Sequence, residues 1–586
     1  MKKKTLVGSL LLVSALTTLL VACGSGSKSS SSSNSSTSTL AQATTNKKAT
    51  VKGATFKFGY QLVSPFKGVF ANELSTEATD TDISQFGNEP LFKVNDSYQI
   101  VDGGAANLKL DDSAKTATIT INPNVKWSDG KPLVAEDIVY AYKIIANPKS
   151  QSQRYTGALQ NIVGLTEYHD GKSGDNISGI TTPDGENGKT VVIKFKEMKP
   201  GMKFSGNGYF WENAEPYHYL KDVAFDKLIS SDKVRKNPIF FGPYKISKMV
   251  SGQSIEWVPN TYYYGDKPQL GKITVEVISP NQAPTAAAQG KYDYLGIGPT
   301  SYAKIKDSKN VKVLGRDSLS YSYMTFNLGK YDAAKSTNVM DDKKLFADKN
   351  LRLAVAYAMN VAQVAEKIYP NTGSQSSTLI PAAFGKYHDK SVKAYAYDLS
   401  KAEKLLDDAG YKKGSDGYRT DKNGKKMTIR WLTTTGNSNT DAINQTYMQA
   451  FKKIGLHVVY ATGKPVDFSV YQDKLTSGSN DYDMFDGSWS LSSEPSPSDL
   501  YSASAPFNFT HFVTAKNTEL LNNIDSQKAF DTSYRIDQFN QWQQYMHDEA
   551  YVIPTLTTKT LVAVSPQVKN LSLAPSASWA DVAMTK

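Results

Sequence analysis

A cluster of residues suited to ligand binding lies between residues 481 and 511, which read DYDMFDGSWSLSSEPSPSDLYSASAPFNFTH. Asp483 and Asp486 flank an apolar pair, and Gly487, Ser488 and Trp489 follow directly. An acid can fix the charged end of a ligand, a glycine allows close backbone approach, and a tryptophan supplies a flat apolar wall. The combination predicts a binding groove; the alternative is a core strand followed by its loop.

Hydrophobic periodicity predicts the elements that hold this cluster. The front of the stretch predicts a strand that leaves a core, and its Ser- and Pro-rich remainder predicts irregular structure. In the last third of the chain strands alternate with helices, which predicts an α/β fold. The strands are expected at 321–328, 426–432, 456–460 and 552–556, and the helices at 351–369, 400–409, 440–454 and 535–549.

Shorter elements are expected nearer the amino terminus. Strands are predicted at 55–62, 117–121, 254–258 and 272–278, and residues 66–82 are expected to be looser. Trp127–Pro132 has the composition of a turn, and a helix with acids in its first turn is expected from Ala135. Trp127 and Asp129 are therefore interpreted as structural.

The sequence lacks recognisable catalytic and metal-binding motifs. It contains no HExxH, CxxC or GxSxG pattern, and its six histidines show no ligand spacing on one element. Gly188-Lys189-Thr190 is not a phosphate loop, because Pro183 stands where that motif requires a glycine. A binding protein without cofactor or metal is therefore favoured over an enzyme, although a triad can assemble from distant residues.

The amino terminus predicts export and lipid anchoring. Residues 1–22 place three lysines before a short apolar run, as a signal peptide does. The run ends in LVAC, which resembles the bacterial lipobox and makes Cys23, the only cysteine, the expected lipidation site. Residues 23–50 comprise this cysteine and a Ser/Thr-rich segment, of which 24–48 is expected to be a flexible tether. The expected location is the extracellular face of the bacterial cytoplasmic membrane.

The net charge bears on which partners the protein can bind, and the chain length bears on the number of domains. The full chain has a formal net charge of +11, which falls to about +8 once the signal-peptide lysines are removed. No block of Lys and Arg with interleaved aromatic residues occurs, so nucleic acid is not an expected partner. The part of the 586-residue chain that follows the tether is longer than one ordinary domain, which predicts two or three lobes.

Four ordered motifs resemble the large extracytoplasmic substrate-binding proteins of peptide ABC importers. They are KWSDGKPLVAEDIVYAYKIIANP at 126–148, FGPYKISKMVSGQSIEWVPNTYYYGDKP at 241–268, the helix at 351–360 and the block at 483–495. Within that family the chain looks most like the oligopeptide-binding lipoproteins of lactococci and related Gram-positive bacteria. The resemblance covers about residues 50–586.

The resemblance implies a three-lobed periplasmic-binding-protein-like fold of class α/β, with two main lobes, a hinge and an inserted lobe. Lobe I would comprise 51–82, 200–315 and 556–586, lobe II, the insert, 83–199, and lobe III 316–555. Closure of the main lobes would trap an oligopeptide, held mainly through its main chain as an added strand. The protein would work as a monomer and deliver the peptide to a membrane-embedded ABC permease.

The resemblance also assigns site residues. Many relatives hold the peptide's ammonium with an aspartate three residues after the tryptophan, where this chain has Ser492. Asp486 is therefore the expected amine anchor, with Asp483 and Glu494 as alternates, and loss of the anchor is a further option. The remaining expected peptide contacts are Gly487, Ser488, Trp489 and Ser490, with Ser75, Thr76 and Glu77 in a counter-strand from lobe I.

Other cargoes and another class of protein remain open at this point. The cargo could be a signalling peptide (a pheromone), a dipeptide, a nickel chelate or haem, although few histidines and no Cys or Met cluster disfavour a metal. A surface peptidase or an adhesin is the alternative from outside the binding proteins. A peptidase would cleave bound peptides, whereas a binding protein would return them intact.

Overall fold

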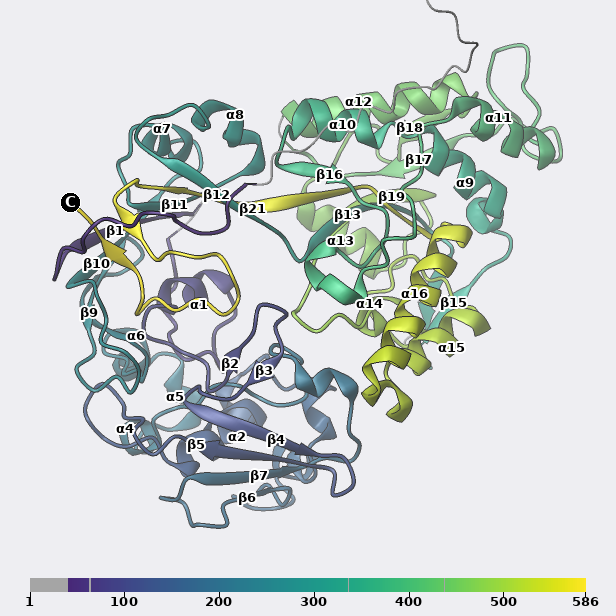
Figure 1. Ribbon diagram of the computed structural model, residues 1–586. Coiled ribbons are helices and arrows are strands. Elements are labelled where there is room, and N and C mark those ends of the chain that lie inside the picture. Colours follow the sequence, from purple (N-terminus) through teal and green to yellow (C-terminus); the bar gives the residue numbers. More distant parts are fainter. Residues whose placement is uncertain (1–39, 63–64, 333, 336, 437) are drawn as a thin grey trace, which may run out of the picture. The chain divides into compact units, whose positions relative to one another are not determined.

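The computed structural model describes residues 40–62, 65–332, 334–335, 337–436 and 438–586, which lie in one compact unit (Figure 1). The predicted signal peptide, Cys23 and the tether as far as residue 39 lie outside the described residues. Helices and strands are mixed along the chain, which confirms the predicted α/β class. No helix among the described residues is long and apolar enough to cross a membrane.

The largest sheet has eight strands and brings together segments from both ends of the chain. In it β1 pairs in parallel with β10 and β11, and the other pairs are antiparallel. Phe56, Phe58, Ile273 and Val275 alternate into its core, as period-two patterning requires. Its strands, in order, are β12 (Lys312–Asp317), β21 (Leu556–Val564), β11 (Tyr294–Ile297), β1 (Thr55–Gln61), β10 (Lys272–Ile278), β9 (Ser254–Pro259) and β8 (Tyr244–Val250), and β16 (Gly373–Gln375) pairs with β21.

A five-stranded sheet carries the stretch around Trp489. Its order is β18 (Val458–Tyr460), β17 (Ile429–Leu432), β19 (Met484–Ser490), β13 (Ser320–Phe326) and β20 (Val552–Pro554). Two short connections join this sheet to the eight-stranded one, at 318–319 between β12 and β13 and at Thr555 between β20 and β21. Hydrogen bonds join the two chain segments at this point: the Ser318 amide donates to the Thr558 carbonyl at 3.3 Å, and the Thr555 amide donates to the Ser322 carbonyl at 2.8 Å.

A four-stranded sheet has its own apolar core and packs with helix α2 (Ala135–Ala146). Its order is β4 (Ala106–Asp111), β5 (Thr116–Ile121), β7 (Thr190–Lys194) and β6 (Ile180–Thr181). Asp137 accepts hydrogen bonds from the Trp127 indole, the Val134 amide and the Tyr217 amide, each at 2.9 Å. Trp127 is thus a buried anchor for the start of α2, which fits its predicted structural role.

The remaining elements are three two-stranded pairs and further helices. The pairs are β2 (Lys93–Val94) with β3 (Ile100–Val101), β14 (Gly329–Asp332) with β15 (Thr337–Met340), and β22 (Val568–Lys569) with β23 (Ala583–Met584). The other α-helices are α1 (Ala78–Ser84), α3 (Leu165–His169), α4 (Tyr217–Leu220), α5 (Phe225–Leu228), α6 (Asp232–Arg235), α7 (Ala283–Ala288), α8 (Tyr302–Ile305), α9 (Lys349–Ala358), α10 (Val361–Ile368), α11 (Leu399–Asp408), α12 (Ser438–Lys453), α13 (Phe468–Thr476), α14 (Ser498–Tyr501), α15 (Ala515–Ile524) and α16 (Thr532–Glu549).

The helix predicted over 351–369 is two helices, α9 and α10. The chain leaves the helical conformation at Met359, which has ψ of 119°, and the Asn360 side chain caps α10 by accepting from the Gln363 amide at 3.2 Å. An asparagine side chain competes in this way for backbone donors and favours helix starts over helix interiors. Apolar periodicity continues through the break, and the sequence pattern therefore predicted a single helix.

The end of the predicted tether is bound to the body of the protein. Thr44 donates its amide to the Leu571 carbonyl at 2.8 Å, and the Asn46 side chain donates to the Thr585 hydroxyl at 2.7 Å. Leu40 packs with an apolar cluster of the eight-stranded sheet. The prediction of flexible chain as far as Lys48 is therefore wrong for residues 40–48, because the carboxyl-terminal segment supplies hydrogen-bond partners that composition cannot reveal.

Candidate functional site

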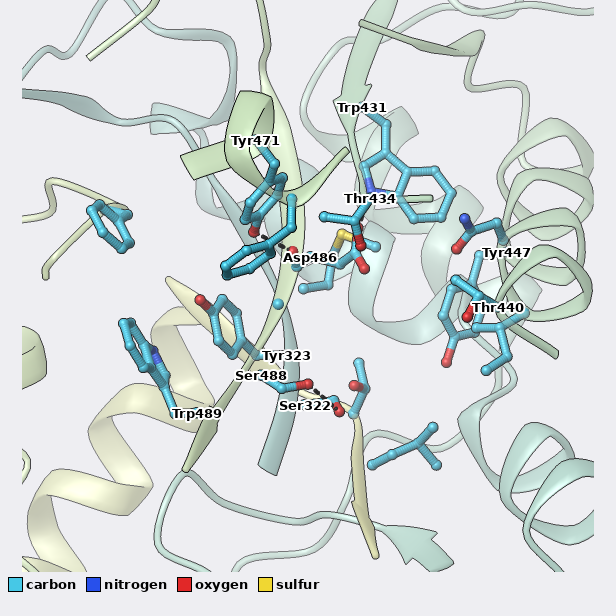
Figure 2. A pocket seen from close by; sticks show the side chains of 18 of the residues that line it. Ser322, Tyr323, Trp431, Thr434, Thr440, Tyr447, Tyr471, Asp486, Ser488 and Trp489 are labelled. Atoms are coloured by element: carbon cyan, nitrogen blue, oxygen red, sulfur yellow. Dashed lines mark hydrogen bonds between the residues drawn. The ribbon is translucent and has the colours of Figure 1, made fainter. Parts of the chain in front are cut away.

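A cavity of about 400 Å³ lies against the five-stranded sheet. Strands β13, β17 and β19 and helices α12 and α13 supply most of its lining. Asp486, Gly487, Ser488 and Trp489, four of the residues predicted to contact a ligand, all line it. In Figure 2 Asp486 lies between Tyr323, Tyr471 and Trp489 on one side and Trp431, Thr434, Thr440 and Tyr447 on the other.

Aromatic rings form one wall of the cavity. The Trp489 ring is stacked with Tyr323, with 6.4 Å between centroids, and with Phe509, with 6.1 Å between centroids. Ser322 and Ser488 are register partners on β13 and β19, and their hydroxyl oxygens are 2.8 Å apart (Figure 2). The cavity thus combines flat apolar surface with hydroxyl groups, which suits a ligand of mixed character.

Asp486 is the acidic group of the cavity. Its carboxylate accepts a hydrogen bond from the Trp431 indole at 2.8 Å, and its main-chain carbonyl accepts one from the Tyr471 hydroxyl. Burial raises the pKa of Asp486, and neighbouring Thr433 and Trp431 oppose that rise. An ammonium group would stabilise the charged form, because an opposite charge offsets the cost of desolvation.

Two buried polar atoms at the cavity lack hydrogen-bond partners within the described chain. They are the Asn444 amide nitrogen and the Tyr447 hydroxyl, both on α12, and both residues are at most 4% exposed. An unsatisfied buried polar group costs about 1–3 kcal/mol. A ligand that pairs with these atoms would remove that cost.

The main chain of β19 is open on one side at the cavity. Strand β13 pairs with the whole of β19, from Met484 to Ser490, whereas β17 reaches only Met484 and Phe485. From Gly487 to Ser490 the side of β19 that faces away from β13 has no strand partner among the described residues. Free amides and carbonyls at a strand edge can pair with an extended chain.

Three of the predicted residues in and near β19 lie outside the cavity. Asp483 forms a two-pronged ion pair with Arg430, with N–O distances of 3.0 and 2.8 Å. Ser490 lies at the end of β19 opposite Ser320. Glu494 forms a buried ion pair with Arg535 at 2.6 Å. The two alternate anchors, Asp483 and Glu494, are therefore each paired with an arginine side chain of the protein.

Ser75, Thr76 and Glu77 also lie away from this cavity and outside any strand. They lead into α1, with Glu77 as its N-cap residue. Ser75 is buried and its carbonyl accepts from Arg154 at 3.0 Å, while Glu77 pairs with Lys67 at 2.8 Å. The segment expected to form the counter-strand is thus an irregular stretch that precedes a helix. Its contact with a ligand stays a prediction.

The cavity residues that come from other segments were not predicted from the sequence. Tyr323, Trp431, Asn444, Tyr447 and Tyr471 reach the cavity from β13, β17, α12 and α13. The aromatic residues of 321–328 were the only local signal for any of these cavity residues. That signal was weak, because an aromatic residue in a strand is more often part of a core. The described residues contain no group of three His, Cys, Asp or Glu side chains arranged to bind a metal ion.

Comparisons with known proteins show which family the chain belongs to. The model of the family described as "Bacterial extracellular solute-binding proteins, family 5 Middle" matches residues 99–511. The oligopeptide-binding protein OppA of Lactococcus lactis subsp. cremoris (strain SK11) is 43% identical over 608 residues, which cover 100% of this chain and 98% of that protein. The oligopeptide-binding protein AppA of Bacillus subtilis (strain 168) is 25% identical over 82% of this chain and 83% of that protein.

Solved structures extend the comparison to the fold. Lactococcal OppA, complexed with an endogenous peptide in the closed conformation, gives a TM-score of 0.77 at 44% identity and covers 91% of this chain and 100% of that one. AppA from Bacillus subtilis in complex with a nonapeptide gives a TM-score of 0.66 at 22% identity over 92% of this chain and 100% of that one, which shows the shared fold. The chain therefore belongs to family 5 of the bacterial extracellular solute-binding proteins.

Proposed function

We propose that this protein captures oligopeptides outside the cell and delivers them to an ABC permease of the cytoplasmic membrane. The observation that carries the proposal is the unpaired edge of β19 from Gly487 to Ser490, which borders a cavity walled by Trp489 and Tyr323. An extended peptide can add to such an edge as a strand. Main-chain pairing is indifferent to side chains, so we expect a broad range of peptides.

Within this proposal Asp486 binds the ammonium group of the peptide. Its half-buried carboxylate lines the cavity and is not paired with a cation of the described chain. The alternates Asp483 and Glu494 already neutralise Arg430 and Arg535. We expect Ser488, Trp489 and Ser490 to contact the peptide, and we keep Ser75, Thr76 and Glu77 as proposed contacts from lobe I.

The proposed movement is closure of lobe I (51–82, 200–315 and 556–586) against lobe III (316–555), with lobe II (83–199) as an insert. The two side-by-side connections at 318–319 and Thr555 support a hinge there, because they join the two large sheets with few residues. A hinge of this kind absorbs closure in a small number of backbone dihedrals. Lipidation of Cys23 would keep the protein at the membrane, and we propose that it acts as a monomer without catalysis.

Native mass spectrometry of the purified chain tests the proposal. Gentle ionisation followed by denaturation is expected to release a ladder of intact peptides carried from the host. If none is released, a mixed peptide digest is added, and binding without cleavage is expected. Progressive trimming of the digest would contradict the proposal and indicate a peptidase.

The amine anchor needs a separate test. Asp486→Asn keeps the shape of the side chain and removes its charge. We expect it to weaken binding of free-amine peptides about tenfold and to leave N-acetylated peptides within twofold of the wild type. Equal effects on both kinds of peptide would show that Asp486 does not bind the ammonium group.

A further inference from the structure

A second cavity, of about 330 Å³, lies beside the eight-stranded sheet. None of the residues predicted from the sequence to contact a peptide lines it. Its aromatic lining includes Trp579 and Tyr294, whose ring centroids are 5.8 Å apart, and the Trp579 indole donates a hydrogen bond to Gln85 at 2.9 Å. The cavity therefore has a fixed aromatic wall.

One cation, Arg316, is among the residues lining this cavity. The side chain belongs to β12, is half-buried, and donates from Nη1 to the Tyr98 hydroxyl at 3.2 Å. No carboxylate in the described ranges lies within 4.0 Å of its guanidinium nitrogens. An arginine has five donors in a planar fork, and this contact uses one of them.

The acids near Arg316 along the chain and in space are bound elsewhere. Asp317, the next residue, forms an ion pair with Lys559. Asp82 and Arg316 both influence the pKa of Tyr294, so both lie near that residue. The Asp82 carboxylate accepts a hydrogen bond from the Tyr60 hydroxyl at 2.7 Å. A half-buried guanidinium left without an acid is the group that pairs most strongly with a carboxylate, through two parallel hydrogen bonds.

The second cavity is within reach of a peptide held in the first. Arg316 on β12 and Ser322 on β13 are six residues apart in the chain. Six residues span at most about 20 Å. An extended peptide of about six or more residues can therefore place one group beside Ser322 and another beside Arg316.

We infer that Arg316 and Tyr98 form a subsite for a carboxylate of the bound peptide, with Trp579 and Tyr294 packing against the residue that carries it. The inference rests on the proposed peptide-binding function. The carboxylate has two sources, the carboxyl terminus of the peptide and an acidic side chain. Both present the same planar pair of oxygens to the guanidinium.

Three synthetic pools of nonapeptides test the subsite. The first is randomised without Asp and Glu and has a free carboxyl terminus, the second is the same pool amidated, and the third is amidated with Glu at randomised positions. Relative affinities for the wild type and for Arg316→Gln are measured by native mass spectrometry. We expect the wild type to prefer the first or the third pool over the second by about tenfold, and Arg316→Gln to lose that preference.

The outcomes separate the subsite from the function. Preference for the first pool identifies the carboxyl terminus, and preference for the third identifies a side chain. Equal binding of all three pools by the wild type would overturn the subsite and leave peptide binding intact. Failure of the wild type to bind any pool would overturn the proposed function together with the subsite.

Two variants guard against a purely structural effect. Arg316→Lys keeps the charge and is expected to retain part of the preference for the carboxylate pool. Lys312→Gln removes an exposed cation from β12 itself, outside the cavity lining, and is expected to leave the preference unchanged. If Lys312→Gln abolished the preference as fully as Arg316→Gln, general electrostatics and not this subsite would be responsible.

Discussion

Tyr323 lies directly over Gly487, its register partner on the neighbouring strand: a β-carbon added to Gly487 would be 2.7 Å from the Tyr323 hydroxyl oxygen and 2.9 Å from ring carbon Cζ. The missing side chain makes room for the ring, and the ring then stacks with Trp489. The glycine of the Asp-Gly-Ser-Trp sequence thus shapes the wall of the first cavity.

Gly487→Ala should disturb this wall. The added methyl group must displace the Tyr323 ring, and overpacking of this kind costs about 1–3 kcal/mol of folding free energy. We expect peptide affinity to fall at least tenfold in a titration followed by Trp fluorescence. Gly157→Ala, where a β-carbon meets nothing within 4 Å, is the matched control and should bind as the wild type does. Unchanged affinity in Gly487→Ala would show that the wall is not part of the peptide site.

Asp483→Ala should lower stability without changing peptide binding. The carboxylate binds the Arg430 side chain and also accepts its backbone amide at 2.8 Å, so its loss should cost about 1–2 kcal/mol in urea unfolding. Peptide affinity should remain within twofold of the wild type. Asp481→Ala, which removes a partly exposed partner of Lys474, should cost less than about 1 kcal/mol. A large loss of peptide affinity in Asp483→Ala would indicate that Asp483 binds the ammonium group of the peptide.

Glu494→Ala should be among the more destabilising single changes. It leaves the guanidinium of Arg535, which is 2% exposed, with the longer carboxylate contact to Asp525 at 3.4 Å and a hydrogen bond to the Ile524 carbonyl at 3.1 Å. Breaking a buried pair from one side costs about 3–5 kcal/mol. Adding Arg535→Met to this variant should restore part of the loss in urea unfolding. Asp408→Ala, in the exposed pair with Lys404, serves as the control and should change stability by less than about 0.5 kcal/mol.

The buried acids Glu73 and Glu215 should make stability depend on pH. Burial and the neighbouring Glu73 carboxyl raise the pKa of Glu215 well above its ordinary 4.5. Between pH 4.5 and that raised pKa the folded state keeps a proton that the unfolded state has released. The free energy of unfolding should therefore fall as pH rises, by up to about 1.4 kcal/mol per pH unit for one proton.

Glu215→Gln removes this titration and keeps the shape of the protonated side chain. We expect its urea unfolding free energy to decline less than that of the wild type between pH 5 and pH 8. Asp307→Asn, at an exposed acid, should leave the wild-type pH dependence intact. A Glu215→Gln profile parallel to the wild type would show that this carboxyl does not hold the proton.

The sequence alone determined the class of the fold and one strand of the first cavity. Most of the strands and helices that period-two and helical patterns predicted lie close to observed elements, because local patterning reflects which face of an element is buried. Asp486, Gly487, Ser488 and Trp489 were found together because they are consecutive on one strand. The motifs at 126–148 and 241–268 pointed to the family that the comparisons show.

Only the tertiary structure decided which groups are free to bind a ligand. Asp483, Asp486 and Glu494 are acids of one short stretch, yet Arg430 and Arg535, 53 and 41 residues away, occupy the first and last of them. Trp431, Asn444 and Arg316 reach the two cavities from other segments. The pairing of a charge depends on what the fold brings within about 4 Å of it, and distance along the chain carries almost no information about that.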